Sequence, residues 1–159
     1  GFRPFAPSVL EEDIAEYFVL ARPSPYMLLV IPTQQARRKT EPAGYADWEL
    51  YQRLYHQRSD IPALTHIDYS ARIQSVNKHT NPRYWALINE FKRQTGYGVI
   101  VNTSFNVRGE PIVCTPDDAF RCFMRTEMDY LVLGDFLFCK AEQQDLEDDS
   151  DWREEIMLD

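Results

Sequence analysis

The chain has 159 residues, of which 44% are hydrophobic and 13% aromatic, with a net charge of −8. This length suits one domain with a proper core, and the composition is that of an ordinary globular protein. No apolar run approaches the length that crosses a bilayer, and the amino terminus lacks the charged-then-apolar pattern of a secretion signal. We therefore expect a cytoplasmic protein with no membrane partner.

The negative charge is concentrated at one end of the chain. Residues 141–159 hold nine acids and one base, whereas residues 1–140 hold sixteen acids and sixteen bases. We predict that residues 1–140 form the domain and that residues 141–159 form an acidic tail. A balanced body has no basic surplus to neutralise many phosphates, which argues against duplex nucleic acid as a partner.

The first half of the chain predicts a short helix, a strand and a loosely specified region. Ser8 suits the N-cap of a helix over residues 10–18, whose first turn is acidic. A central strand is expected over residues 26–31, stopped by Pro32. Residues 33–62 are predicted to be an insertion or lid, mobile in its first half, with a helix over residues 46–57.

The second half predicts alternating strands and helices. A strand at residues 72–76 precedes the clearest helix, residues 82–95, with Asn81 as its N-cap and Gly96 at its end. The predicted buried stripe of this helix is Trp85, Leu87, Ile88 and Phe91. Further strands are expected at residues 99–101 and 112–113, then a helix at 119–126 capped by Thr115, and a hairpin joining residues 128–133 to 136–139. This order indicates an α/β fold.

Cysteine and histidine give no sign of a disulfide framework or a metal site. The three cysteines, Cys114, Cys122 and Cys139, are odd in number, form no Cys-x-x-Cys pair and have apolar neighbours. Buried, reduced thiols are therefore expected. The three histidines, His56, His66 and His79, lack metal-site spacing, so this chain is expected to have no metal ligands of its own.

The most informative stretch follows the apolar run at residues 98–101. Asn102, Thr103 and Ser104 carry hydrogen-bond donors, and Arg108 supplies the fork that matches phosphate or carboxylate. Polar groups after a buried strand are typical of ligand sites in open α/β sheets. Composition alone leaves a structural turn and an oxyanion-binding loop about equally favoured.

The run Asn-Thr-Ser-Phe-Asn-x-Arg-Gly-Glu-Pro resembles the C-terminal domain of the carbamoyltransferase family, whose members carbamoylate antibiotics and nodulation factors. Other stretches resemble the family in the same order, and they end before Lys140: residues 2–10, 24–28, 65–76, 81–84 and 129–135. The resemblance implies a YrdC-like fold, an open twisted mixed sheet with flanking helices.

The resemblance also implies a function. Family members form a carbamoyl adenylate from carbamoyl phosphate and ATP, with Mg²⁺ accompanying ATP as co-substrate. They pass the carbamoyl group to a small-molecule hydroxyl in an N-terminal, actin-like domain that holds a metal ion and is absent from this chain. The alternatives are a nucleotide- or RNA-binding YrdC-like module without carbamoyl chemistry, and an interaction domain whose acidic tail recruits a partner.

The family match assigns roles to eight residues. Three are expected to be catalytic: Arg72, Ser104 and Arg108. Five are expected to bind substrate or nucleotide: Arg3, His66, Asn102, Thr103 and Asn106. His66 and Asp68 could instead hold their loop in shape, and Tyr69 stands where the family usually has glycine.

Two other sets of basic residues have simpler interpretations. Arg37-Arg38-Lys39 reads as a solvated loop, with a lid that closes on phosphates as the alternative. Arg121 and Arg125 are expected on the surface of their helix.

Overall fold

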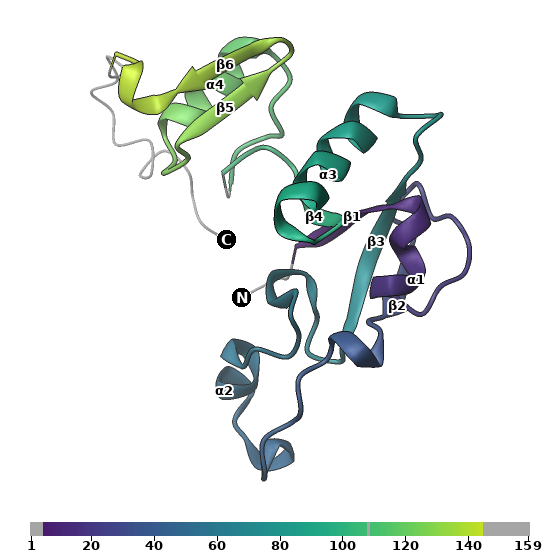
Figure 1. Cartoon of the computed structure of the whole chain (residues 1–159). Coiled ribbons are helices and arrows are strands. Elements are labelled where there is room, and N and C mark those ends of the chain that lie inside the picture. The colour runs from purple at the N-terminus through teal and green to yellow at the C-terminus, as the bar shows by residue number, and fades with distance from the viewer. Residues whose placement is uncertain (1–4, 108, 145–159) are drawn as a thin grey trace. The chain divides into compact units, whose positions relative to one another are not determined.

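A computed structural model describes residues 5–107 and 109–144 of the chain. The chain folds as two compact units, Gly1–Thr103 and Ser104–Asp159 (Figure 1). Arg3 and Arg108, both expected in the ligand site, lie outside the described residues, as does most of the acidic tail.

The first unit contains a four-stranded mixed sheet. Its order is β2 (Leu29–Pro32), β3 (Ser70–Val76), β1 (Ala6–Leu10) and β4 (Val99–Asn102) (Figure 1). The central strands β1 and β3 are parallel, whereas β2 and β4 run antiparallel to their neighbours along the two edges. A mixed sheet with flanking helices confirms the predicted α/β fold.

One face of this sheet forms the main core. Because side chains alternate across a strand, the odd-numbered residues of β3 share a face with Val9 and Val99. That face packs against the fully buried Tyr17 and Phe18, which lie at the end of α1 (Ile14–Tyr17). A short 3₁₀ turn, Glu11–Asp13, joins β1 to α1.

The opposite face is covered at one end by α3 (Pro82–Thr95). Ile88 of this helix forms a buried cluster with Leu10 and Val76. The helix begins where the Asn81 side chain accepts a hydrogen bond from the Tyr84 amide, and it ends at Gly96, which has a φ of 84°. Local caps thus place this helix as the sequence predicts.

The second unit contains one helix and a hairpin. Thr115 and Asp118 form a capping box at the start of α4 (Pro116–Met124). Strands β5 (Tyr130–Leu133) and β6 (Phe136–Cys139) pair antiparallel around Gly134, whose φ of 63° suits a tight hairpin turn. Phe123 and Leu131 are buried.

Several predicted elements are wrong in their place or extent. Ser8 is not an N-cap: it lies fully buried inside β1, and the α-helix begins only at Ile14. The strand predicted to be central, β2, is an edge strand that includes Pro32, because an edge position tolerates a proline without an N–H. The helix predicted at residues 46–57 shrinks to α2 (Leu50–Tyr55), since Trp48 is extended.

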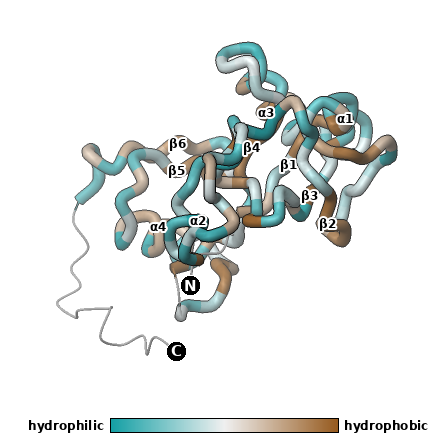
Figure 2. Tube along the Cα trace, turned by 90° about the horizontal axis from the view of Figure 1, so that it is seen from below, coloured by the Kyte–Doolittle hydropathy of each residue, from teal (hydrophilic) through white to brown (hydrophobic). Residues whose placement is uncertain are grey.

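Burial also differs from expectation at several positions. Leu87 and Phe91 of α3 are 60% and 42% exposed, and much of this helix is hydrophilic (Figure 2). No strand forms at residues 112–113, whose backbone is irregular. Cys122 is buried as predicted, but Cys114 is exposed and Cys139 is only half-buried; all three thiols are free.

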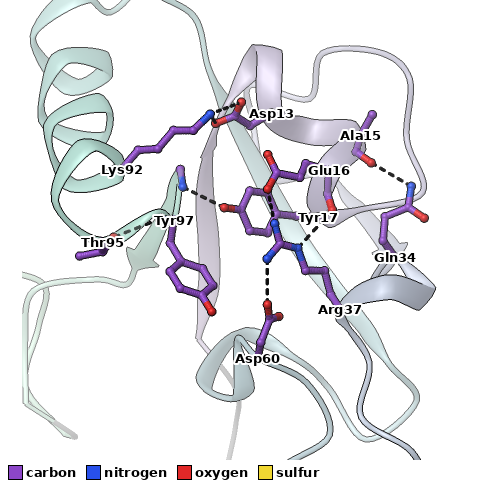
Figure 3. A network of polar contacts seen from close by, with 11 residues as sticks. Asp13, Ala15, Glu16, Tyr17, Gln34, Arg37, Asp60, Lys92, Thr95 and Tyr97 are labelled. Atoms are coloured by element: carbon purple, nitrogen blue, oxygen red, sulfur yellow. Dashed lines mark hydrogen bonds and ion pairs between the residues drawn. The ribbon is translucent and has the colours of Figure 1, made fainter.

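The close approach of Gly98 to Asp13 gives a test of the core. The Gly98 amide donates to the Tyr17 hydroxyl at 2.9 Å, and a Cβ at residue 98 would lie 2.1 Å from Asp13 Oδ2. The buried Asp13 carboxylate is held by Lys92 Nζ at 2.7 and 2.8 Å (Figure 3). We expect Gly98→Ala to lower the free energy of unfolding by about 1–3 kcal/mol, since the added methyl overpacks the site.

Urea denaturation of a double-mutant cycle measures this effect. In an Asp13→Ala background the clash is absent, so Gly98→Ala should cost much less there than in the wild type. Equal losses in both backgrounds would show that the Asp13 contact is not the cause.

Candidate functional site

A group of polar side chains lies on the same sheet face as α3, beyond the cluster that the helix covers. We call it the polar face; it consists of Ser8, Arg72, Gln74 and Asn102. Ser8 pairs in register with Gln74, and Asn102 pairs with Ala6. Residues paired across strands share a face, so β1, β3 and β4 each contribute to it.

Gln74 is the centre of this group. Its Oε1 accepts a hydrogen bond from Asn102 Nδ2 at 2.6 Å and another from Ser8 Oγ at 2.9 Å. Its Nε2 donates to the carbonyl of Pro25 at 3.2 Å. Asn102 Nδ2 also approaches Met27 Sδ at 3.3 Å. Both ends of the Gln74 amide have hydrogen-bond partners, so the Gln74 side chain is fixed. Asn102, which donates to it, is therefore also held in one orientation.

Arg72 is the cation of the polar face. It lies on β3 two residues before Gln74, so both side chains leave the strand on the same side. The Arg72 side chain is exposed and forms no hydrogen bond or ion pair with any residue from 5–107 or 109–144. A guanidinium that is not used internally can pair with a ligand oxyanion.

The turn before β3 is held by its own side chains. Asp68 Oδ1 accepts from the Ser70 hydroxyl at 2.6 Å and from the Ser70 amide at 3.1 Å. The Ser70 hydrogen bond lowers the pKa of Asp68, helped by the nearby His66. The His66 amide donates to the Ser70 carbonyl at 2.8 Å, and its Nδ1 lies 3.4 Å from the Ser70 hydroxyl. This geometry favours a loop-holding role for His66 and Asp68.

Tyr69 within this turn has a φ of 62°, in the left-handed region that glycine adopts readily. The turn therefore keeps a glycine-like backbone although a tyrosine occupies it.

The predicted oxyanion-binding loop, which begins at Asn102, spans the boundary between the two units. Asn102 and Thr103 belong to the first unit, and Ser104 begins the second. Thr103 and Ser104 are exposed. Asn106 is not a free donor, because its Nδ2 bonds the carbonyls of Val107 and Glu110 at 3.0 and 2.9 Å.

The second unit corrects the interpretation of Arg125. Arg125 is not a surface residue: its side chain is 12% exposed and its Nη1 lies 2.9 Å from Glu110 Oε1. This ion pair ties the loop around Glu110 to the end of α4. Arg121 is exposed, as expected.

The basic run at residues 37–39 is not a simple solvated loop. Arg37 Nη1 donates to Asp60 Oδ2 at 2.8 Å, another nitrogen pairs with Glu16, and its Cζ lies 4.3 Å from the centre of the Tyr17 ring (Figure 3). Arg38 donates twice to the Thr33 carbonyl, at 3.0 and 2.8 Å. Both arginine side chains are therefore bonded to other residues of the first unit. Closure of this segment as a lid stays a prediction.

Of the four residues on the polar face, Arg72 and Asn102 are predicted from the sequence as candidates for the ligand site, whereas Ser8 and Gln74 are not. The alternation of Arg72 and Gln74 could have placed both on one face, but the partner of Ser8 depends on strand register. Among residues 5–107 and 109–144, no group of three metal-ligating side chains is found, and no helix is long and apolar enough to span a membrane.

The hydrogen bonds of Asp68 predict a pH effect. A carboxylate with a lowered pKa stabilises the fold above its unfolded pKa, about 3.9, and this contribution is lost as the pH falls through the lowered value. The free energy of unfolding should therefore fall less between neutral and acidic pH in Asp68→Asn than in the wild type. The difference should be less than about 1 kcal/mol, because solvent screens an exposed carboxylate.

Urea unfolding at a series of pH values measures this slope. Asp47→Asn, at an exposed carboxylate of the same unit, serves as the control and should leave the slope nearly unchanged. Identical slopes for the wild type and Asp68→Asn would contradict the proposed role of the Ser70 hydrogen bond.

Comparison with known proteins identifies the family. The family described as "Carbamoyltransferase C-terminus" matches residues 1–140. The chain is 55% identical to "Uncharacterized protein sll1178" of Synechocystis sp., over 100% of the chain and 26% of that protein.

Two relatives have functional names. Nodulation protein NolO of Bradyrhizobium diazoefficiens is 39% identical over 88% of the chain and 22% of its own length. The 3'-hydroxymethylcephem-O-carbamoyltransferase of Amycolatopsis lactamdurans is 32% identical over 89% of the chain and 23% of its own length. The chain thus spans about a quarter of the length of these relatives. It belongs to the family of carbamoyltransferase C-terminal domains.

Proposed function

We propose that this chain is the carbamoyl-adenylate-forming part of an ATP-dependent carbamoyltransferase. Carbamoyl phosphate and ATP are its substrates, and a hydroxyl group of a small molecule is the final acceptor. The transfer takes place in a separate, actin-like N-terminal domain that holds a metal ion. Family membership and a relative named as an O-carbamoyltransferase support carbamoyl transfer.

The unpaired Arg72 on the polar face carries the proposal. Phosphate oxygens of carbamoyl phosphate and ATP need fixed positive charge, and a guanidinium provides two parallel donors at a set angle. Because Arg72 has no partner among the described residues, ligand binding breaks no internal ion pair. The cost of freeing this side chain for an anion is therefore small.

Gln74 and Ser8 are proposed to position Asn102. With its amide nitrogen fixed on Gln74 Oε1, Asn102 presents its remaining polar atoms in a constant orientation at the carboxyl end of β4. Preorganised dipoles stabilise developing charge because they need no reorganisation during the reaction. Gln74 is thus a positioning residue, whereas Arg72 and Asn102 are proposed to contact substrate.

The hydroxyls of Thr103 and Ser104 would add donors to phosphate oxygens, and Asn106 would shape the loop that carries them. Arg3 and Arg108 keep their predicted roles as proposals, whereas ligand binding by His66 is proposed only beside its part in holding the turn before β3. Mg²⁺ would arrive with the phosphates of ATP, which commonly supply its ligands. A mixed anhydride between carbamoyl and adenylyl groups also requires that water be kept away from the reacting atoms.

Ligand binding tests the site itself. Carbamoyl phosphate or Mg²⁺–ATP at millimolar concentration should raise the melting temperature of the chain, by the linkage of binding to stability. We expect a small shift, because the chain spans about a quarter of the length of these relatives and we propose that further residues of the whole protein contribute to the site. A folded chain whose melting temperature does not respond to either ligand would argue against the site.

Exchange of labelled pyrophosphate into ATP tests the reaction. In the proposed reaction, water releases phosphate from carbamoyl phosphate, and an oxygen of the resulting carbamate attacks the α-phosphorus of ATP with pyrophosphate as the leaving group. This route predicts an exchange that requires carbamoyl phosphate, whereas a nucleotide-binding module without carbamoyl chemistry would bind ATP and show none. Arg72→Lys should lower the exchange rate by about 10- to 150-fold, since a charged hydrogen bond contributes roughly 1.5–3 kcal/mol.

Arg93→Lys is the matched control for this substitution. Arg93 is an exposed residue of α3, and its ion pair with Glu90 at 2.6 Å lies on the surface. Surface pairs contribute little, so the exchange rate should stay near that of the wild type. If Arg93→Lys slows the exchange as much as Arg72→Lys does, Arg72 has no special role.

A further inference from the structure

A pocket lined mostly by polar side chains lies in the first unit. Its volume is about 310 Å³. The lining residues are Gln35, Arg38, Lys39, Thr40, Glu41 and Tyr69. None of them belongs to the polar face, and all but Tyr69 come from the segment at residues 33–62.

Tyr69 shows two costly features at once. Its φ of 62° is strained for a bulky side chain. The residue is only 9% exposed. Its hydroxyl is buried and has no hydrogen-bond partner within the described part of the chain. The Glu41 carboxylate lies near this hydroxyl but does not meet hydrogen-bond geometry. Burial raises the pKa of Tyr69, and the nearby Glu41 raises it further. The hydroxyl therefore keeps its proton at neutral pH.

Two cations, Arg38 and Lys39, line the same pocket as Tyr69. Arg38 Cζ is 5.1 Å from the centre of the Tyr69 ring, so the guanidinium lies over the ring. Nε and Nη2 of Arg38 bond the Thr33 carbonyl, and Nη1 has no hydrogen bond among the described residues. The side chain of Lys39 is exposed and likewise forms no hydrogen bond or ion pair with any residue from 5–107 or 109–144.

A strained residue, a buried hydroxyl without a partner and two available cations at one pocket are together typical of a ligand site. We infer that this pocket binds a small molecule that carries both an oxyanion and an N–H or O–H donor. Arg38 and Lys39 take the oxyanion, Tyr69 donates its hydroxyl to it, and Glu41 accepts from the donor group. The inference does not depend on carbamoyl chemistry at the polar face.

Isothermal titration with three probes tests the pocket: O-phosphoethanolamine, inorganic phosphate and ethanolamine. Only phosphoethanolamine carries both the oxyanion and the donor, so it should bind most tightly and ethanolamine most weakly. Tyr69→Phe and Lys39→Ala should each weaken phosphoethanolamine binding by about fivefold or more, the effect of one lost hydrogen bond or ion pair. Glu41→Gln should reduce the preference for phosphoethanolamine over phosphate.

Controls separate this pocket from the polar face and from effects on folding. Lys78 is an exposed lysine whose Nζ lies 4.8 Å from the centre of the Trp85 ring, and it does not line the pocket. Arg72→Ala and Lys78→Ala should leave phosphoethanolamine binding unchanged. Tyr69→Phe should unfold at the same urea concentration as the wild type or a higher one, because it removes a buried group without a partner.

Three results would each overturn the inference. The first is the absence of phosphoethanolamine binding at millimolar concentration. The second is binding that survives both Tyr69→Phe and Lys39→Ala. The third is binding that Arg72→Ala abolishes, which would place the anion on the polar face.

Discussion

The two hydrogen bonds that the Gln74 side-chain carbonyl accepts are the constraint on which the polar face depends. Ser8 donates to this one oxygen from the neighbouring strand β1, and Asn102 donates to it from β4, the next strand on the same side. The side chains therefore join β1, β3 and β4, as the backbones do. Ser8 is fully buried, and a buried hydroxyl without a partner would be costly. The network therefore serves both the stability of the sheet and the orientation of Asn102.

The same sheet has a buried apolar face and a second face that carries the proposed ligand site. The odd-numbered side chains of β3 enter the core with Tyr17 and Phe18, and its even-numbered side chains include Arg72 and Gln74. The helix α3 covers only the Leu10 and Val76 end of the second face. A polar face can thus present an uncompensated cation because the hydrophobic stabilisation of this sheet comes largely from the opposite side.

Local signals in the sequence were reliable for the helix that has clear caps at both ends, whereas strand pairing over long distances in the chain could not be predicted. The helix at residues 82–95 follows from Asn81, Pro82 and Gly96, which act within a few residues of their positions. Ser8 was misassigned because its place in β1 depends on parallel pairing with β3, more than sixty residues away. Arg72 and Asn102 could be predicted from the motifs, whereas Gln74, and the ion pair of Arg125 with Glu110, required the register and the loop path.

The turn at residues 66–70 links the two proposed sites. Asp68 and Ser70 bond each other, and the Thr33 amide donates to the Tyr69 carbonyl at 2.7 Å, so the strained backbone of Tyr69 is fixed from two directions. Strain persists only where the surrounding contacts over-determine it. Arg72 lies three residues after Tyr69, on the strand β3 that follows the turn, and belongs to the polar face. One short turn therefore sets the position of Tyr69 in its pocket and the start of the strand that carries the cation, so changes to its hydrogen bonds should affect both places together.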